Sequence, residues 1–300
     1  MRVKDDNYFI AGTAYKGDDR DVWVSVQNRE GNPTLANDFI FGTDDYLEEA
    51  ADVLILEDNS FLILGSTTNI DENKWKGVVD ANDSTDILLL KVNSQGNLLW
   101  RKRLGYGGKD VGVKIEKMEN GNFAILGNSK IGTDFEIFIA LLNPDGNVYN
   151  TRNLKPGRQN KALGLDYKNG LLSLSGSADG VAYLESLDQS LNTQSEFSAN
   201  SIFSTEISSE INSVISTEEG TLLITATWSK ENREKDASVL LLGANGKKIW
   251  QDPLFFGSEE DDQSVMALPL DQDKYLLLGN FKFGSNTMMG LLKISEIGLK

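Results

Sequence analysis

An apolar segment followed by glycine and small polar residues recurs six times along the 300-residue sequence, and this repeat restricts the fold more than any other feature. The copies are NYFIAGTA, NSFLILGST, GNFAILGNS, GLLSLSGSA, GTLLITATW and DKYLLLGNF. Their equivalent positions are taken as Gly12, Gly65, Gly127, Gly176, Thr225 and Gly279, which lie 53, 62, 49, 49 and 54 residues apart. One structural unit of about 50 residues therefore occurs six times.

Each unit has the pattern of four short β-strands. A second apolar run follows each copy, namely DVWVSVQ, DILLLKV, EIFIALL, VAYLESL, ASVLLLG and MGLLKIS, and turns such as SQGN and PDGN follow most of them. Short runs rich in Val, Ile, Leu and Phe, separated by Asn-Gly or Asp-Gly turns, are typical of antiparallel strands. These two runs are strands b and c, with strand a before them and strand d after them. Four strands in each of six units predict an all-β fold, a six-bladed β-propeller; an array of β-sandwiches would need domains about twice as long.

We expect one propeller domain over residues 1–300, with units of approximately 1–44, 45–108, 109–159, 160–206, 207–260 and 261–300. The central apolar positions of the b strands are predicted to be buried: Ile10, Leu64, Leu126, Leu174, Ile224 and Leu278. Trp23, Trp100 and Trp250 are predicted to fill the space between neighbouring blades.

Strand d is present in five units only. The last unit stops at Leu291–Lys300, and the first begins with the stub Met1–Val3 in place of a full strand a. We therefore expect the last blade, or the closure of the ring, to be incomplete. An upstream segment carrying an export signal and the closing strand would complete the ring. A cytosolic start with an imperfect ring is the alternative, and a lipid anchor removed upstream stays open.

Composition excludes several classes of function. The chain contains no histidine and no cysteine, which removes Ser-His-Asp and Cys-His catalysis, imidazole or thiolate metal sites, and disulfides. The net charge of −16 and the lack of a basic patch argue against a nucleic-acid partner. No apolar run approaches the roughly 20 residues of a transmembrane span.

The run TDILLLKVNSQGNLLWRKRLGYGGKD, followed by IEKMENGNFAILGNS, resembles the Gly-Gly-rich, quinoprotein-like propeller repeats of Bacteroidota and archaeal cell-envelope proteins. The resemblance is clearest over residues 45–150 and 207–282 and weakest over 160–206. Gly96 with Trp100, and Gly246 with Trp250, are similar to the Gly-x-x-x-Trp docking element of quinoprotein-like propellers. The resemblance implies an interaction protein of the cell envelope, periplasmic or extracellular, with a cytoplasmic location as the alternative. It implies no reaction.

The candidate site lies on the side of the blades that carries the b–c and d–a loops, because these loops are irregular while the a–b and c–d turns are short. The candidate binding residues in these loops are Asp44, Asp45, Asp71, Glu72, Trp75, Lys76, Asp80, Asp83, Trp228, Glu259 and Glu260. Trp75, in the longest loop, is the best contact candidate, although it could instead fold back as a lid on its own loop.

A cofactor is not expected. Asp80, Asn82, Asp83 and Asp86 offer oxygen ligands suited to calcium, but the stretch lacks the glycine and the terminal glutamate of an EF-hand loop. Carboxylates on surface loops are ordinarily solvated, so the calcium reading is the weaker one.

Three functions remain. The first is a non-enzymatic propeller that binds a protein or glycan partner through its b–c and d–a loops. The second is a glycoside-acting enzyme, because paired carboxylates need no histidine; against it, the sialidase Asp-box is absent, since Trp100 and Trp250 follow their glycines by four positions rather than three. The third, a quinone-cofactor dehydrogenase, is suggested only by the Gly-x-x-x-Trp element. The partner and the oligomeric state are not predicted.

Overall fold

The computed structural model describes residues 1–34, 38–43, 46–68, 85–105, 108–198, 208–217, 221–229, 234–243, 247–250, 252–270 and 274–295. Within these ranges all regular structure is β-strand, and none of it is helix. In the same ranges we find no helix of the length and apolar character that crossing a bilayer requires.

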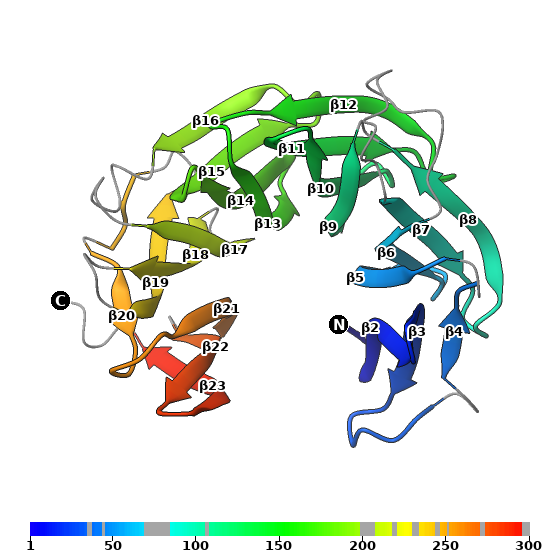
Figure 1. Ribbon diagram of the computed structural model, residues 1–300, viewed down its shortest axis with the longest axis horizontal. Coiled ribbons are helices and arrows are strands. Elements are labelled where there is room, and N and C mark those ends of the chain that lie inside the picture. Colours follow the sequence, from blue (N-terminus) through cyan, green and yellow to red (C-terminus); the bar gives the residue numbers. More distant parts are fainter. Residues whose placement is uncertain are drawn as a thin grey trace. The chain divides into compact units, whose positions relative to one another are not determined.

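The strands form six separate antiparallel sheets (Figure 1). In chain order the strands are β1 (Arg2–Lys4), β2 (Asn7–Lys16), β3 (Asp19–Gln27), β4 (Phe39–Phe41), β5 (Glu48–Ile55), β6 (Phe61–Thr67), β7 (Asp86–Val92), β8 (Leu98–Leu104), β9 (Lys109–Lys117), β10 (Phe123–Ile131), β11 (Asp134–Leu142), β12 (Val148–Leu154), β13 (Asn160–Lys168), β14 (Leu171–Ala178), β15 (Val181–Asp188), β16 (Thr193–Ser198), β17 (Ser209–Ser216), β18 (Thr221–Ser229), β19 (Lys235–Gly243), β20 (Leu254–Phe256), β21 (Gln263–Leu270), β22 (Lys274–Phe283) and β23 (Asn286–Ser295).

Each sheet is a simple meander in which neighbouring strands are consecutive in sequence. Five sheets have four strands, and the sixth has three, β21–β22–β23, within the described residues. The predicted order a, b, c, d is therefore confirmed, including the incomplete last blade. The fourth strand of the fifth sheet is short, since β20 covers only Leu254–Phe256.

The chain divides into two compact units, Met1–Leu154 and Lys155–Lys300, and each contains three sheets. Within the first unit, β5 packs on the sheet β1–β4, and β9 packs on the sheet β5–β8. Within the second unit, β17 packs on the sheet β13–β16, and β21 packs on the sheet β17–β20. The first strand of a sheet thus contacts the face of the preceding sheet, as Figure 1 shows inside each unit. The expectation of one domain over 1–300 stays a prediction.

The repeated glycine marks a close approach of two strands. In five sheets the first strand carries a β-bulge. The repeated position of the second strand lies directly opposite this bulge. A Cβ atom on Gly65 would lie 2.2 Å from the Glu49 carbonyl oxygen, so only glycine fits there. In the fifth sheet the residue opposite the bulge is Ala226, whereas the sequence analysis placed the equivalent position at Thr225. The alignment was one residue off because the fifth copy has no glycine to mark it.

The core of the described residues includes three clusters of apolar side chains, each formed by neighbouring sheets of one unit. Leu64, Leu126, Leu174 and Ile224 are buried as predicted. Ile10 and Leu278 are only half-buried, which corrects the prediction for these two residues. Their strand neighbours Phe9 and Leu277 face the adjacent sheet of the unit. Because side chains alternate along a strand, Ile10 and Leu278 lie on the opposite face of the first and last sheets.

The turns between the third and fourth strands share one hydrogen-bond pattern in four sheets. The side chain of the first turn residue accepts from two backbone N–H groups, two and four residues later. These first residues are Asn28, Asn93, Asn143 and Asp188. In the fourth sheet Leu191 takes the left-handed position, φ 65°, that glycine holds in the others. The turn therefore persists where its sequence signature is lost.

Aromatic residues in or just before the fourth strands join neighbouring sheets, as predicted for Trp100 and Trp250. A Cβ on Gly146, in the next sheet, would lie 2.8 Å from the Trp100 ring, and a Cβ on Gly96 would overlap Phe39 in the same way. Trp250 meets Tyr275 edge-on at 5.4 Å between ring centroids. Trp23 lies differently: its ring covers Gly12 in its own sheet, and its Nε1 donates to Asp38 at 3.0 Å.

Candidate functional site

Most of the predicted binding residues lie outside the described ranges. These are Asp44, Asp45, Asp71, Glu72, Trp75, Lys76, Asp80 and Asp83, together with the calcium candidate Asn82. Asp86, the last calcium candidate, is fully buried at the start of β7, next to Thr67 of β6 in the strand register. The described part of the site consists of the loop 257–262 and the end of β18, both in the second unit.

The loop 257–262 is built around the buried carboxylate of Asp262. Its Oδ1 accepts from the Lys282 backbone N–H at 2.8 Å, and its Oδ2 accepts from the Ser258 backbone N–H. The Asp262 backbone N–H donates to the Lys235 carbonyl at 2.6 Å. The side chain of Asp262 therefore ties the loop to β22, and its backbone N–H ties it to the start of β19, so the role of Asp262 is structural.

The neighbouring acidic residues differ in the exposure of their side chains and in their partners. Asp261 Oδ1 accepts from the Lys235 backbone N–H at 2.9 Å, and Glu260 forms an ion pair with Lys282 at 3.3 Å. Glu259 is exposed. Of the two glutamates predicted here, Glu259 is the one available to a partner, whereas Glu260 already neutralises a lysine of the same unit.

An aromatic pair lies near this loop. Trp228, at the end of β18, stacks on Phe255 of β20 with ring centroids 4.8 Å apart. The indole is half-buried against the apolar core of the second unit, and Phe255 is 43% exposed. The predicted residue Trp228 thus contributes to a surface that combines an exposed aromatic ring with the acidic loop. Phe255 was not predicted, although its position in a short apolar run before an acidic loop is a usable signal.

Among the described residues, no group of three or more His, Cys, Asp or Glu side chains is arranged to hold a metal ion. The calcium stretch lies almost wholly outside the described ranges, so the calcium hypothesis stays a prediction.

Glu48 is an acid with a strongly raised pKa, and sequence reasoning missed it. Its side chain is buried at the start of β5, and Arg101 Nη1 lies 3.5 Å from Oε1. Burial raises the pKa of Glu48 to about 7, against the lowering effects of Arg101 and of the Thr43 backbone N–H. Asp21 and Asp19 raise the pKa further. Perturbed acids are enriched at functional sites, but also in buried ion pairs such as this one.

The sequence matches no known family, and no curated protein matches it either. Solved structures do match. A mutant puromycin hydrolase has a TM-score of 0.55 and 9% identity, covering 96% of this chain and 42% of the hydrolase chain. A subtype N10 neuraminidase-like protein of A/little yellow-shouldered bat/Guatemala has a TM-score of 0.51 and 10% identity, covering 96% and 90%. The chain thus spans less than half of the hydrolase.

These neighbours are propellers, and at such low identity they establish the fold alone. Together with the six meander sheets, they place the chain in the class of six-bladed β-propellers.

Proposed function

We propose that the chain is a non-enzymatic β-propeller that binds a protein or glycan partner through its b–c and d–a loops. The observation that carries the proposal is the loop 257–262, which is held in place by buried Asp262 and exposes Glu259. The loop directly follows β20, whose exposed Phe255 packs on Trp228. Fixed loops with exposed aromatic and charged side chains favour recognition, because little side-chain freedom is lost on binding.

The proposal includes kinship with the Gly-Gly-rich envelope repeats and hence a periplasmic or extracellular location. The support is the repeated Gly-Asn turn and the docking of Trp100 on the glycine turn of the next sheet. Cell fractionation with an antibody against the chain tests the location. Recovery in the cytosolic fraction alone would contradict it.

Binding is tested with the Glu259→Lys variant and with a deletion of residues 69–84. Glycan arrays and affinity capture with the intact chain supply the ligand, and titration then measures its affinity for each variant. We expect weaker binding for both variants. Glu119→Lys is the matched control, because Glu119 is exposed in an a–b turn, on the other side of the blades. Equal affinities for all variants would exclude these loops as the binding surface.

A glycoside-acting enzyme is the second candidate, and the raised pKa of Glu48 is the observation in its favour. A general acid must also reach its substrate, yet the Glu48 side chain is fully buried. A panel of chromogenic glycosides decides the matter. Turnover that is lost on substitution of Glu48, Asp44 or Glu259 would replace the binding proposal by an enzymatic one.

A further inference from the structure

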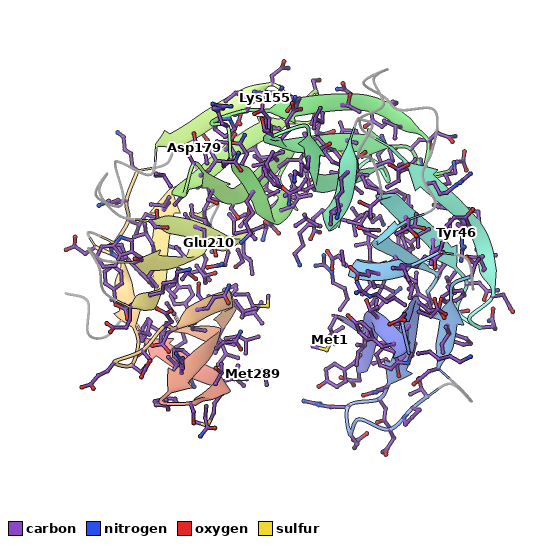
Figure 2. All side chains as sticks on the ribbon, viewed as in Figure 1. Met1, Tyr46, Lys155, Asp179, Glu210 and Met289 are labelled. Atoms are coloured by element: carbon purple, nitrogen blue, oxygen red, sulfur yellow. The ribbon has the colours of Figure 1, made fainter. Side chains whose placement is uncertain are left out.

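The outer edge of β23 differs from every equivalent strand of the chain. In the other five sheets the third strand is covered by a fourth strand, namely β4, β8, β12, β16 or β20. Within the described residues β23 has no such neighbour, and three of its apolar side chains are exposed: Met288, Met289 and Leu291. Figure 2 marks Met289 on this last strand. An uncovered edge offers a row of backbone N–H and C=O groups to another strand.

The strand register identifies the residues that are equivalent to Met289 in the sheets with four strands. The matching pairs across the second and third strands are Gly65–Leu88, Gly127–Phe138 and Gly279–Gly290. Met289 precedes Gly290 and so corresponds to Ile87 and Ile137. Ile87 and Ile137 are 0% and 1% exposed, whereas Met289 is 75% exposed. Ile87 lies in a core cluster that includes Leu104 of its own fourth strand and residues of the following sheet. The last sheet therefore exposes a position that is buried where a fourth strand and a following sheet are both present.

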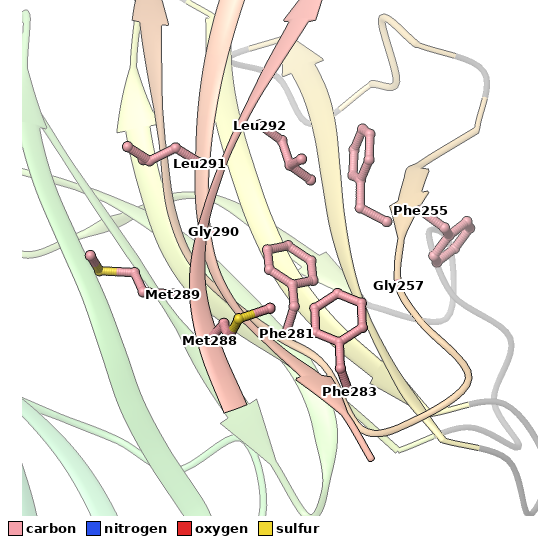
Figure 3. Close-up of a pocket in the computed structure, with 10 residues that line it drawn as sticks. Phe255, Gly257, Phe281, Phe283, Met288, Met289, Gly290, Leu291 and Leu292 are labelled. Atoms are coloured by element: carbon pink, nitrogen blue, oxygen red, sulfur yellow. The ribbon is translucent and has the colours of Figure 1, made fainter. Parts of the chain in front are cut away.

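An apolar groove runs beside this edge. It has a volume of about 540 Å³ and lies between β20 and the strands β22 and β23. Phe281, Phe283, Met288 and Leu292 lie on the side of β23 that faces Phe255 (Figure 3). Met289 and Leu291 project from the opposite side. A strand placed along β23 would bury side chains of both sets, because its own side chains alternate between the two faces.

The complete sheets show the chemistry of the strand that fits. The fourth-strand residue opposite the position of Met289 is apolar in four sheets, in the pairs Val22–Phe41, Ile87–Leu104, Ile137–Leu154 and Ala237–Phe256. β8 also carries Arg101, Lys102 and Arg103, and a chain of net charge −16 attracts a basic segment.

We infer that β23 binds an extended segment of another polypeptide chain as an added fourth strand. The segment runs antiparallel to β23, places Leu or Phe opposite Met289, and carries basic residues. Main-chain hydrogen bonds to β23 give affinity, and the groove at Phe281 and Phe283 selects the side chains. Phe255 borders both this groove and the loop of the proposed function. The edge of β23 is tested below through Leu291, which lies outside that loop, so either proposal can fail without the other.

The probe is the synthetic peptide NLLWRKRLG, which has the sequence of residues 97–105 and supplies a strand of this chemistry. We expect saturable binding to the intact chain by fluorescence anisotropy. A scrambled peptide of the same composition controls for attraction by net charge, and its equal binding would overturn the proposal. N-methylation of backbone amides should abolish binding on one set of alternate residues and preserve it on the other, because only one set faces β23. Equal effects of both sets would also overturn the proposal.

The surface is tested with Leu291→Glu, an exposed substitution that leaves the core intact. It should weaken peptide binding on the order of tenfold or more, since it places a charge beside the added strand. Ile40→Glu is the matched control, because Ile40 is equally exposed on the outer strand of the first sheet, and it should bind as the unmodified chain does. Unchanged binding by Leu291→Glu would overturn the proposal. So would a dimer of the chain that Leu291→Glu converts to a monomer, because the groove would then hold a second copy.

Discussion

At the scale of single residues, Glu48 links pH to stability. The pKa of its carboxyl is raised to about 7 in the folded chain, against an ordinary value of 4.5, because the group is buried. The folded state therefore holds this proton more tightly than the unfolded state does. The contribution of Glu48 to stability is most favourable below pH 4.5 and declines as the pH rises through 7.

We predict that Glu48→Gln is more stable than the unmodified chain at pH 8, by an amount on the order of 3 kcal/mol, and that the advantage disappears near pH 4.5. The neutral amide keeps the shape of the side chain and avoids the cost of the buried charge. Urea unfolding of both proteins at several pH values measures the difference. A constant difference across this range would show that Glu48 titrates at its ordinary pKa.

Alanine at Gly146 is predicted to destabilise the chain more than alanine at Gly121, for a steric reason. Gly146 and Gly121 both have φ near +75°, at 73° and 80°, so alanine at either site costs about 1–2 kcal/mol in backbone strain. A Cβ on Gly146 would also collide with Trp100, whereas none of the surrounding atoms lies within 4 Å of one on Gly121. Gly146→Ala should therefore lose roughly 1–3 kcal/mol more than Gly121→Ala by chemical denaturation. Equal losses would show that the Trp100 contact contributes nothing.

At the scale of elements, the burial of equivalent leucines depends on the position of their sheet. Leu64 of β6 is fully buried, whereas Leu278 of β22 is half-buried on the face of its sheet that points away from the core cluster of the second unit. Leu64→Ala should cost about 2–5 kcal/mol and Leu278→Ala clearly less, because the second leaves no closed cavity. The two losses of stability are compared through the midpoints of denaturant unfolding, measured for variants with equal m-values. Equal costs would mean that Leu278 is covered by contacts outside its own unit.

The strands could be predicted from the sequence because their apolar runs and Asn-Gly turns are local signals. The fourth unit shows the limit: Leu191 replaces the turn glycine, yet Asp188 makes the same hydrogen bonds as Asn93 and Asn143. Register is not local. The apolar pattern cannot distinguish Ala226 from Thr225 as the equivalent position, because a strand looks equally apolar when it is shifted by one residue.

The candidate site was less accessible to prediction than the fold. The exposed acid Glu259 and the half-buried Trp228 could be found, because charged loops and terminal aromatic residues are visible in the sequence. Asp262 could not be distinguished from Glu259 by residue type, since only the fold shows that its carboxylate accepts from Lys282 and Ser258. The pairing of Glu48 with Arg101 joins residues 53 positions apart, and no pattern in either strand indicates it.

At the scale of the whole molecule, the six sheets differ in how well their third strands are protected. β3, β7, β11, β15 and β19 each lie between two strands, whereas β23 has a neighbour on one side only within the described residues. Backbone amides that are not hydrogen-bonded exchange with solvent without any unfolding. In an antiparallel pair, hydrogen-bonded and free positions alternate along the strand.

We therefore predict that every second backbone amide of β23 exchanges fastest among the second and third strands of all six sheets. The amides between them are hydrogen-bonded to β22 and should exchange only when that pairing opens. The short β1, with three residues, should be the next least protected element. Hydrogen exchange read by NMR resolves the alternation, and β7 serves as the internal control because it lies between β6 and β8. Protection of β23 equal to that of β7 would mean that a strand already covers its edge. If the peptide NLLWRKRLG then slows exchange in β23 and nowhere else, the edge itself is where it binds.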